Sequence, residues 1–268
     1  MSTFTRSVVD FFIVAFVTLC VLGVFIADVF IFRVKPSSYV DSDISHLVKL
    51  ETSEGNTISA AYYPNPKAEY TVLVSHGNSE DLGSSQHFAQ ELVKHGFAAM
   101  IYDYYGYGTS EGKPTEHNSY LAVEAVYNYL VNTQHVPNRK VIAYGHSLGS
   151  ALATYLAEHE AVGGLVIEGA FTSAFRVLTV YPMVPFDKFE TDSRIGNIDI
   201  PKLIIHGTAD QVIAFWHGQE LYERANMPKD YLWVAEAEHS NSRTVDPENY
   251  WKKWQMLLKT MEQFSYSS

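Results

Sequence analysis

Six apolar runs separated by helix-length segments constrain the fold of this 268-residue chain more than any other feature of its sequence. The runs alternate little with polar residues and are YTVLVSHG, AAMIYDYYG, KVIAYGHS, GLVIEGAF, PKLIIHGTAD and YLWVAEAEHS. Helical patterns separate or follow them, around residues 84–95, 116–133, 148–159, 215–226 and 246–264. Apolar strands that alternate with helices form a parallel sheet covered on both faces. The sequence therefore predicts an α/β fold with a mostly parallel central sheet and helices on both faces.

A strand hairpin is expected ahead of these six runs. HLVKLE and TISAAYY read as strands, and the intervening TSEGN contains Gly55-Asn56, which suits a tight turn. We expect residues 45–268 to form one globular domain, because α/β folds of this length are commonly single domains. Residues 36–44 have the polar composition of a short linker that precedes this domain.

Residues 1–35 are expected to be a membrane anchor with its flanks. The run Phe11–Ala27 contains no charged residue, and about 20 apolar residues in a helix span the hydrocarbon core of a bilayer. The run is longer than the apolar region of a typical signal peptide, and no small-x-small cleavage site follows it. The sequence therefore predicts a single-pass membrane protein whose N-terminal transmembrane helix contacts the lipid bilayer, with a cleaved signal peptide as the alternative. Basic residues flank the run on both sides, so the positive-inside rule leaves the side of the globular domain open.

The composition argues against one broad class of partner. The formal net charge is −11 at pH 7, and an acidic surface is repelled by phosphate backbones, so no nucleic-acid partner is expected. The single cysteine, Cys20, lies inside the apolar run, so no intrachain disulfide can form. The domain must therefore be stable through its core alone.

Polar residues stand at the ends of five of the six runs, where an open α/β sheet binds its ligands. They are His76, Asp103, Ser147, Glu168, and His206 followed by Asp210. The stretch DYYGYGTSEGKP after Asp103 lacks the glycine spacing and the lysine of a phosphate-binding loop. We interpret Asp103 as a structural hydrogen-bonding residue.

The sequence Gly145-His146-Ser147-Leu148-Gly149 fits the G-x-S-x-G nucleophile elbow, with a strand before it and a helix after it. The serine of such an elbow has a strained backbone at the tip of a tight turn, and side chains at the flanking positions would collide with neighbouring backbone. The pattern alone is weak, but its strand-turn-helix context is the expected one. Ser147 is therefore predicted to be a catalytic nucleophile.

A serine hydroxyl needs a histidine to take its proton and a carboxylate to orient that histidine. Four histidines follow the serine, in the chain order expected for this architecture; they are His159, His206, His217 and His239. We predict His239 as the base because it follows the last strand in a loop at the crevice edge. We predict Asp210 as the acid because its loop precedes that of the base, and Glu168 remains the alternative.

Two backbone donors are expected to stabilise the oxyanion that forms during acyl transfer. One is the N–H of Leu148 at the start of the helix after the serine, where the helix dipole favours negative charge. The other is the N–H of Asn78, in the loop after the first run. Such a site needs no cofactor and no metal, and none is predicted.

The motifs HGNSEDLG, YDYYGYGTSEGKP, YGHSLGS, EGAFTS and HGTADQVI resemble those of the membrane-anchored α/β-hydrolase-domain serine hydrolases. This group includes protein depalmitoylases and related bacterial and fungal members. The resemblance extends from about residue 45 to 260 and implies an α/β-hydrolase fold. It also implies Ser147, Asp210 and His239 as catalytic triad, with Asn78 and Leu148 as oxyanion donors. The chain departs from its relatives before the histidine, where Ala237-Glu238 occupies a stretch that usually contains glycine.

The expected activity is hydrolysis of carboxylic esters or thioesters, on acyl lipids or acylated proteins, through an acyl-enzyme. The apolar segment 175–189 is short, so we expect a small cap or none, and it is either an acyl-chain groove or a helix packed on the sheet. A serine peptidase of the same fold and a non-catalytic binding protein that retains the pocket are the alternatives.

Overall fold

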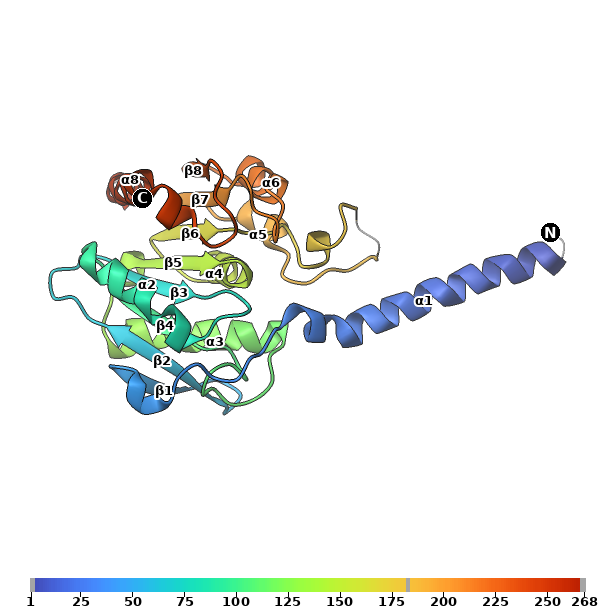
Figure 1. Cartoon of the computed structure of the whole chain (residues 1–268), viewed down its shortest axis with the longest axis horizontal. Coiled ribbons are helices and arrows are strands. Elements are labelled where there is room, and N and C mark those ends of the chain that lie inside the picture. Colours follow the sequence, from blue (N-terminus) through green and yellow to red (C-terminus); the bar gives the residue numbers. More distant parts are fainter. Residues whose placement is uncertain (1–2, 182–183, 266–268) are drawn as a thin grey trace.

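The computed structural model describes residues 3–181 and 184–265, and its centre is an eight-stranded sheet (Figure 1). Residues 1–2, 182–183 and 266–268, which belong to the predicted anchor, cap segment and domain, lie outside the described residues. The strands are β1 Leu47–Glu51, β2 Thr57–Tyr63, β3 Thr71–Ser75, β4 Ala98–Tyr102, β5 Val141–His146, β6 Gly164–Glu168, β7 Lys202–Gly207 and β8 Lys229–Val234.

The strand order is β1-β2-β4-β3-β5-β6-β7-β8. The strands β1 and β2 form the predicted hairpin, and β2 pairs antiparallel with β4, whereas the pairs from β4 to β8 are parallel. Gly55 in the hairpin turn has φ +81°, a conformation that glycine adopts without steric cost. The predicted α/β fold with a mostly parallel sheet is confirmed.

Helices cover both faces of the sheet. They are α2 Leu82–Lys94, α3 Glu116–Asn128, α4 Leu148–His159, α5 Thr191–Ile195, α6 Trp216–Arg224, α7 Ser242–Val245 and α8 Pro247–Ser265, and α1 Thr3–Ile31 precedes them. Side chains of a strand alternate between faces. In β5, Ala143 therefore packs with α3, α4 and α6 in one apolar cluster, while Ile142 and Tyr144 pack with α2 and α8 in the other.

The N-terminal helix α1 extends away from the sheet and meets the domain with its C-terminal part (Figure 1). None of the helices in the described part of the chain has both the length and the sustained apolarity that crossing a bilayer requires. The predicted single-pass membrane localisation is therefore wrong, and contact of α1 with a lipid bilayer has no support. The apolar run is part of a longer helix that carries Asp10 and Asp28, and its C-terminal end is used in packing, where Ala27 is buried and Asp28 pairs with Lys188.

Residues 36–44, expected as a linker, pack on the domain. Tyr39 is 6% exposed, and its hydroxyl donates to Asp103 Oδ2 at 2.5 Å. The backbone N–H of Ser38 donates to Asp81 Oδ2 at 2.7 Å, and Asp81 also caps the N-terminus of α2. Asp103 further accepts from the N–H of Leu82 at 2.7 Å. The buried Asp103 thus joins the segment to the start of α2, which is the structural role expected for it.

We predict that Trp254→Ala destabilises the domain by about 3–5 kcal/mol, because a large buried aromatic side chain would leave a cavity. Trp254 is fully buried in α8, and its ring lies 5.3 Å from that of Phe97 and 5.9 Å from that of Tyr144. Urea denaturation measures the change in free energy of unfolding. The control is Met256→Ala on the same helix, which is 43% exposed and should change the value by less than about 0.5 kcal/mol. Equal effects of the two variants would contradict the assigned packing.

Candidate active site

Ser147 lies in the turn between β5 and α4 with φ +53° and ψ −118°, a strained backbone conformation for a residue other than glycine. The flanking glycines are required by close backbone contacts. A Cβ on Gly149 would lie 2.0 Å from the carbonyl oxygen of Ser75, and one on Gly145 would lie 2.1 Å from the carbonyl oxygen of Gly149. The strand-turn-helix geometry of a nucleophile elbow is therefore present at the predicted position.

His239 and Asp210 are brought together from two neighbouring loops. Asp210 follows β7, His239 follows β8, and His239 Nδ1 lies 2.7 Å from Asp210 Oδ2. The other carboxylate oxygen accepts the N–H groups of Val212 and Ile213, each at 2.8 Å. Burial alone would raise the pKa of Asp210, but hydrogen bonds from His206, His239 and Ile213 outweigh it and hold that pKa well below its usual range. Asp210 is therefore ionised and can fix the tautomer of the His239 ring.

The His239 loop contacts the elbow beside Ser147. His146 Nε2 lies 3.0 Å from the carbonyl oxygen of His239, and the two rings are 5.0 Å apart. A Cβ on Gly169, which follows β6, would lie 3.1 Å from the His239 ring. In the described part of the chain, the hydrogen bonds do not include one between Ser147 Oγ and that ring. Hydrogen bonds of this kind commonly tighten only in the complex with substrate.

The alternative acid is engaged elsewhere. Glu168 Oε2 accepts the hydroxyl protons of Tyr144 and Tyr250, both at 2.9 Å, on the face of the sheet covered by α2 and α8. Because Glu168 is bonded to these two tyrosines, the hydrogen bonds favour Asp210 over Glu168 as the partner of the histidine.

The three other histidines that follow the serine also have other partners. His206 is fully buried, with Nε2 3.0 Å from the carbonyl oxygen of Ile213 and 3.4 Å from Asp210 Oδ2. His217 Nδ1 accepts from the N–H of Thr172, and burial lowers the pKa of His217 to about 4. His159 lies exposed at the end of α4.

An apolar cavity of about 400 Å³ is lined by Ser147 and by both predicted oxyanion residues, Asn78 and Leu148. Leu148 is the first residue of α4, so its N–H has no acceptor within the helix and points with the positive end of the helix dipole. The loop of Asn78 is held from two sides, because its amide donates to the carbonyl oxygen of Ile31 at 2.9 Å and its own carbonyl oxygen accepts from Tyr107 at 3.0 Å. The arrangement can place a substrate carbonyl against the serine.

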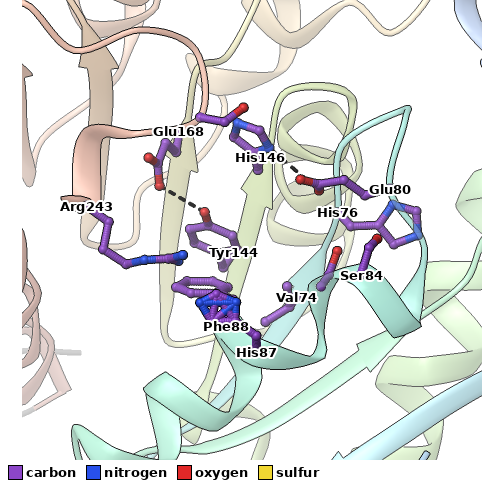
Figure 2. A pocket seen from close by; sticks show the side chains of 12 residues that line it. Val74, His76, Glu80, Ser84, His87, Phe88, Tyr144, His146, Glu168 and Arg243 are labelled. Carbon is purple, nitrogen blue, oxygen red and sulfur yellow. Dashed lines mark hydrogen bonds and ion pairs between the residues drawn. The ribbon is translucent and has the colours of Figure 1, made fainter. Parts of the chain in front are cut away.

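A second, more polar cavity of about 170 Å³ lies beside the elbow on the face covered by α2 (Figure 2). In it Glu80 and His146 point toward each other, with His146 Nδ1 3.8 Å from Glu80 Oε2. The same carboxylate oxygen accepts the N–H of Gly77 at 2.8 Å, so the pair links the Asn78 loop, the elbow and, through His146, the loop of His239. Burial by itself would lower the pKa of His146, but the nearby carboxylate of Glu80 raises it to about 9.

Sequence reasoning gave no role to Glu80 or His146. Both stand inside quoted motifs, Glu80 in HGNSEDLG and His146 as the second residue of the elbow. The sequence signal that could have revealed the pair is an acid and a histidine, each one or two residues from a predicted site residue. The described residues contain no group of three or more His, Cys, Asp or Glu arranged to hold a metal ion.

Comparisons with known proteins agree with this fold. The family model described as "Serine aminopeptidase, S33" matches residues 66–188. Alpha/beta hydrolase domain-containing protein 17B of Homo sapiens is 37% identical over 207 residues, which cover 75% of this chain and 71% of that protein. The worm protein aho-3 of Caenorhabditis elegans, also an alpha/beta hydrolase domain-containing protein, is 37% identical over 66% of this chain and 54% of its own.

Solved structures share the fold at low sequence identity. The esterase Pf2001 of Pyrococcus furiosus superposes with a TM-score of 0.71 at 19% identity, covering 85% of this chain and 95% of that one. The esterase EaEST of Exiguobacterium antarcticum gives a TM-score of 0.61 at 16% identity over 79% and 99% of the two chains. At these identities the likeness is one of fold.

The Glu80–His146 pair is expected to make stability depend on pH. Because the pKa of His146 is raised from 6.5 to about 9 by folding, the stabilisation is fully present below about pH 6.5 and is lost as the pH rises through about 9. The side chain of Glu80 is 38% exposed, so solvent screening reduces the contribution to about 1–2 kcal/mol.

The check is urea denaturation of wild type and Glu80→Gln between pH 6 and 10. The difference in free energy of unfolding should be largest near pH 6 and should shrink toward pH 10. Glu69→Gln, which removes a carboxylate 58% exposed and paired with Lys140, serves as control and should give a smaller difference throughout. A Glu80→Gln difference that stays constant across this range would count against the pair.

Proposed function

Because this chain belongs to the alpha/beta hydrolase domain-containing protein family, we propose that it is a serine hydrolase of acyl esters or thioesters with Ser147, His239 and Asp210 as its triad. The serine hydrolase class follows from the family match; the triad and the substrate class are the proposal. The observation that carries it is the 2.7 Å hydrogen bond between His239 and Asp210, in a loop that touches the strained serine turn.

In the proposed first step, His239 Nε2 takes the proton of the Ser147 hydroxyl as its oxygen attacks the substrate carbonyl carbon. Asp210 accepts the Nδ1–H of the same ring and stabilises the imidazolium that forms. The negative charge on the carbonyl oxygen is met by the N–H groups of Leu148 and Asn78. The tetrahedral intermediate then collapses, His239 gives its proton to the leaving alcohol or thiol, and an acyl-Ser147 ester remains.

The second half repeats these steps with water as nucleophile. His239 accepts a proton from water as the water oxygen attacks the acyl carbon, and the same proton passes to Ser147 Oγ when the ester bond breaks. The free carboxylic acid leaves, and the serine hydroxyl is restored. The cycle uses only side chains and backbone groups of this chain.

An acyl substrate is supported by the walls of the cavity that Ser147 lines. Most of the lining side chains are apolar, and the charged ones are Arg33 and Asp187. Apolar cavities with a few fixed polar groups bind ligands of matching character, and the polar groups fix the reacting end. The ester or thioester carbonyl would lie at Ser147, with the acyl chain in the cavity.

Peptide hydrolysis is the second candidate, because the matching family model carries the name of an aminopeptidase. An aminopeptidase needs an anionic group to bind the substrate ammonium. In the cavity that group would be Asp187, but its oxygens already accept from the Ser173 hydroxyl at 2.6 Å and from the N–H groups of Phe175 and Lys188 at 2.8 and 2.7 Å. This engagement favours acyl esters over peptides.

We expect a fluorophosphonate probe to label the wild-type chain and to leave Ser147→Ala unlabelled, because only an activated serine reacts at phosphorus. Mass spectrometry of the labelled peptide identifies the site. The control is Ser193→Ala, an exposed serine outside the cavity, which should label like wild type. Undiminished labelling of Ser147→Ala would reject the assignment, and absence of labelling in folded wild type would favour a non-catalytic binding protein.

Asp210→Asn is expected to lower kcat for an acyl ester by about 10³–10⁴-fold, since an amide can neither stabilise the imidazolium nor hold the productive tautomer. Steady-state kinetics with a chromogenic ester measures the change. The matched variant is Glu168→Gln at the alternative acid, for which we expect less than a tenfold loss. If Glu168→Gln is the more damaging of the two, the acid comes from the end of β6.

A further inference from the structure

We infer that the C-terminal half of α1 is part of the substrate site, where it closes one side of the apolar cavity, and that the absence of a side chain at Gly23 leaves the cavity room for long acyl chains. The inference rests on the proposed function and adds to it a specificity-determining element. The family model match begins at residue 66, so this helix lies outside the matched part of the chain.

One face of α1 lines the cavity. Leu19, Gly23, Ala27 and Ile31 line it at intervals of four residues, which places them in a single stripe along the helix. Phe30, three residues after Ala27, also lines the cavity. The opposite wall comes from the segment between β6 and α5 and includes Phe175, Leu178 and Phe186. Since Ser147 lines the same cavity, an acyl chain bound to the serine would lie between these walls.

Gly23 stands where the two walls approach each other. A Cβ at this position would lie 3.4 Å from Phe186 Cζ and 3.6 Å from its Cε2, which is ordinary contact. A methyl group therefore fits, whereas a longer side chain would enter the cavity or displace the Phe186 ring. Gly23 lies inside a regular helix, and alanine or leucine favours helix over glycine, so substitution here should narrow the cavity without unfolding α1.

The end of α1 is fixed to both sides of the site. Asp28 Oδ1 lies 2.6 Å from Lys188 Nζ in the cap segment, and the carbonyl oxygen of Ile31 accepts from the Asn78 amide at 2.9 Å. Phe32 is buried, with its ring 5.9 Å from that of Phe189 and 6.4 Å from that of Tyr107. These contacts fix the position of α1 relative to the proposed oxyanion loop. The helix can therefore form one wall of the cavity.

The test measures kcat/KM of the full chain for p-nitrophenyl esters of saturated acids from acetate to laurate. For Gly23→Leu we expect the ratio of the laurate value to the acetate value to fall at least tenfold, because each buried methylene is worth about fourfold. Gly23→Ala should keep the wild-type ratio, since its methyl group fits. Ala15→Leu, a matched substitution at an exposed position two turns earlier on α1, should also keep it.

A binding measurement separates this inference from the proposed function. Laurate binding to Ser147→Ala is compared with binding to the double variant Ser147→Ala with Gly23→Leu by isothermal titration calorimetry, and at least tenfold weaker binding is expected for the double variant. If wild type hydrolyses no ester but laurate binding falls in this way, the proposed reaction fails and the inference stands. If laurate ester is hydrolysed and Gly23→Leu keeps the wild-type ratio, the reaction stands and the inference is overturned. Absence of laurate binding also overturns it.

Discussion

The close approach of the backbone at Gly149 to that of Ser75 is the constraint on which the candidate site depends. No residue with a Cβ fits a gap in which that atom would lie 2.0 Å from a carbonyl oxygen. Because the gap is so narrow, α4 begins directly against the end of β3, and the first N–H of that helix comes beside the loop that follows β3. This close approach requires the strained backbone at Ser147, and the parallel pairing of β3 with β5 holds the serine turn in place.

The sheet places the loops around this turn at one edge, and contacts made by side chains join these loops to one another. Glu80 bonds the backbone of Gly77, and His146 contacts the backbone of His239. The carboxylate and the imidazole carry opposite charge at neutral pH because each shifts the pKa of the other toward its ionised form. The Asp210–His239 bond extends the connection to the loop after β7. The site is thus assembled by contacts between loops as well as by the strand ends.

The sheet and the elbow were predictable because their signals are local. Each buried strand is a short apolar run, and each covering helix has its own period, so the order of elements could be inferred without knowing any tertiary contact. The elbow was predictable because glycines on both sides of the serine are needed to avoid collisions with neighbouring backbone. His239 and Asp210 could be proposed through chain order, which limits the candidates to a few residues after the serine.

The remaining features depend on contacts between distant residues, for which the sequence has no periodic signal. The apolar run of α1 satisfied a length rule for membrane spans, but the packing of its end on the domain was invisible locally, because Lys188 lies 160 residues from Asp28. The role of Tyr39 was missed for the same reason, since its partner Asp103 is 64 residues away. A polar composition between two elements indicated a linker, although Ser38 and Tyr39 bond this segment to Asp81 and Asp103 of the domain.

The separation between α1 and the segment that covers it also matters during synthesis. The helix leaves the ribosome before that segment, and Lys188 follows its partner Asp28 by 160 residues, a delay of roughly 8–32 s at about 5–20 residues per second. During that interval the nascent chain presents an apolar helix before the segment 175–189 that faces it has been made. Exposed apolar surface favours association of incomplete chains, so slower translation should lengthen the exposure of this helix.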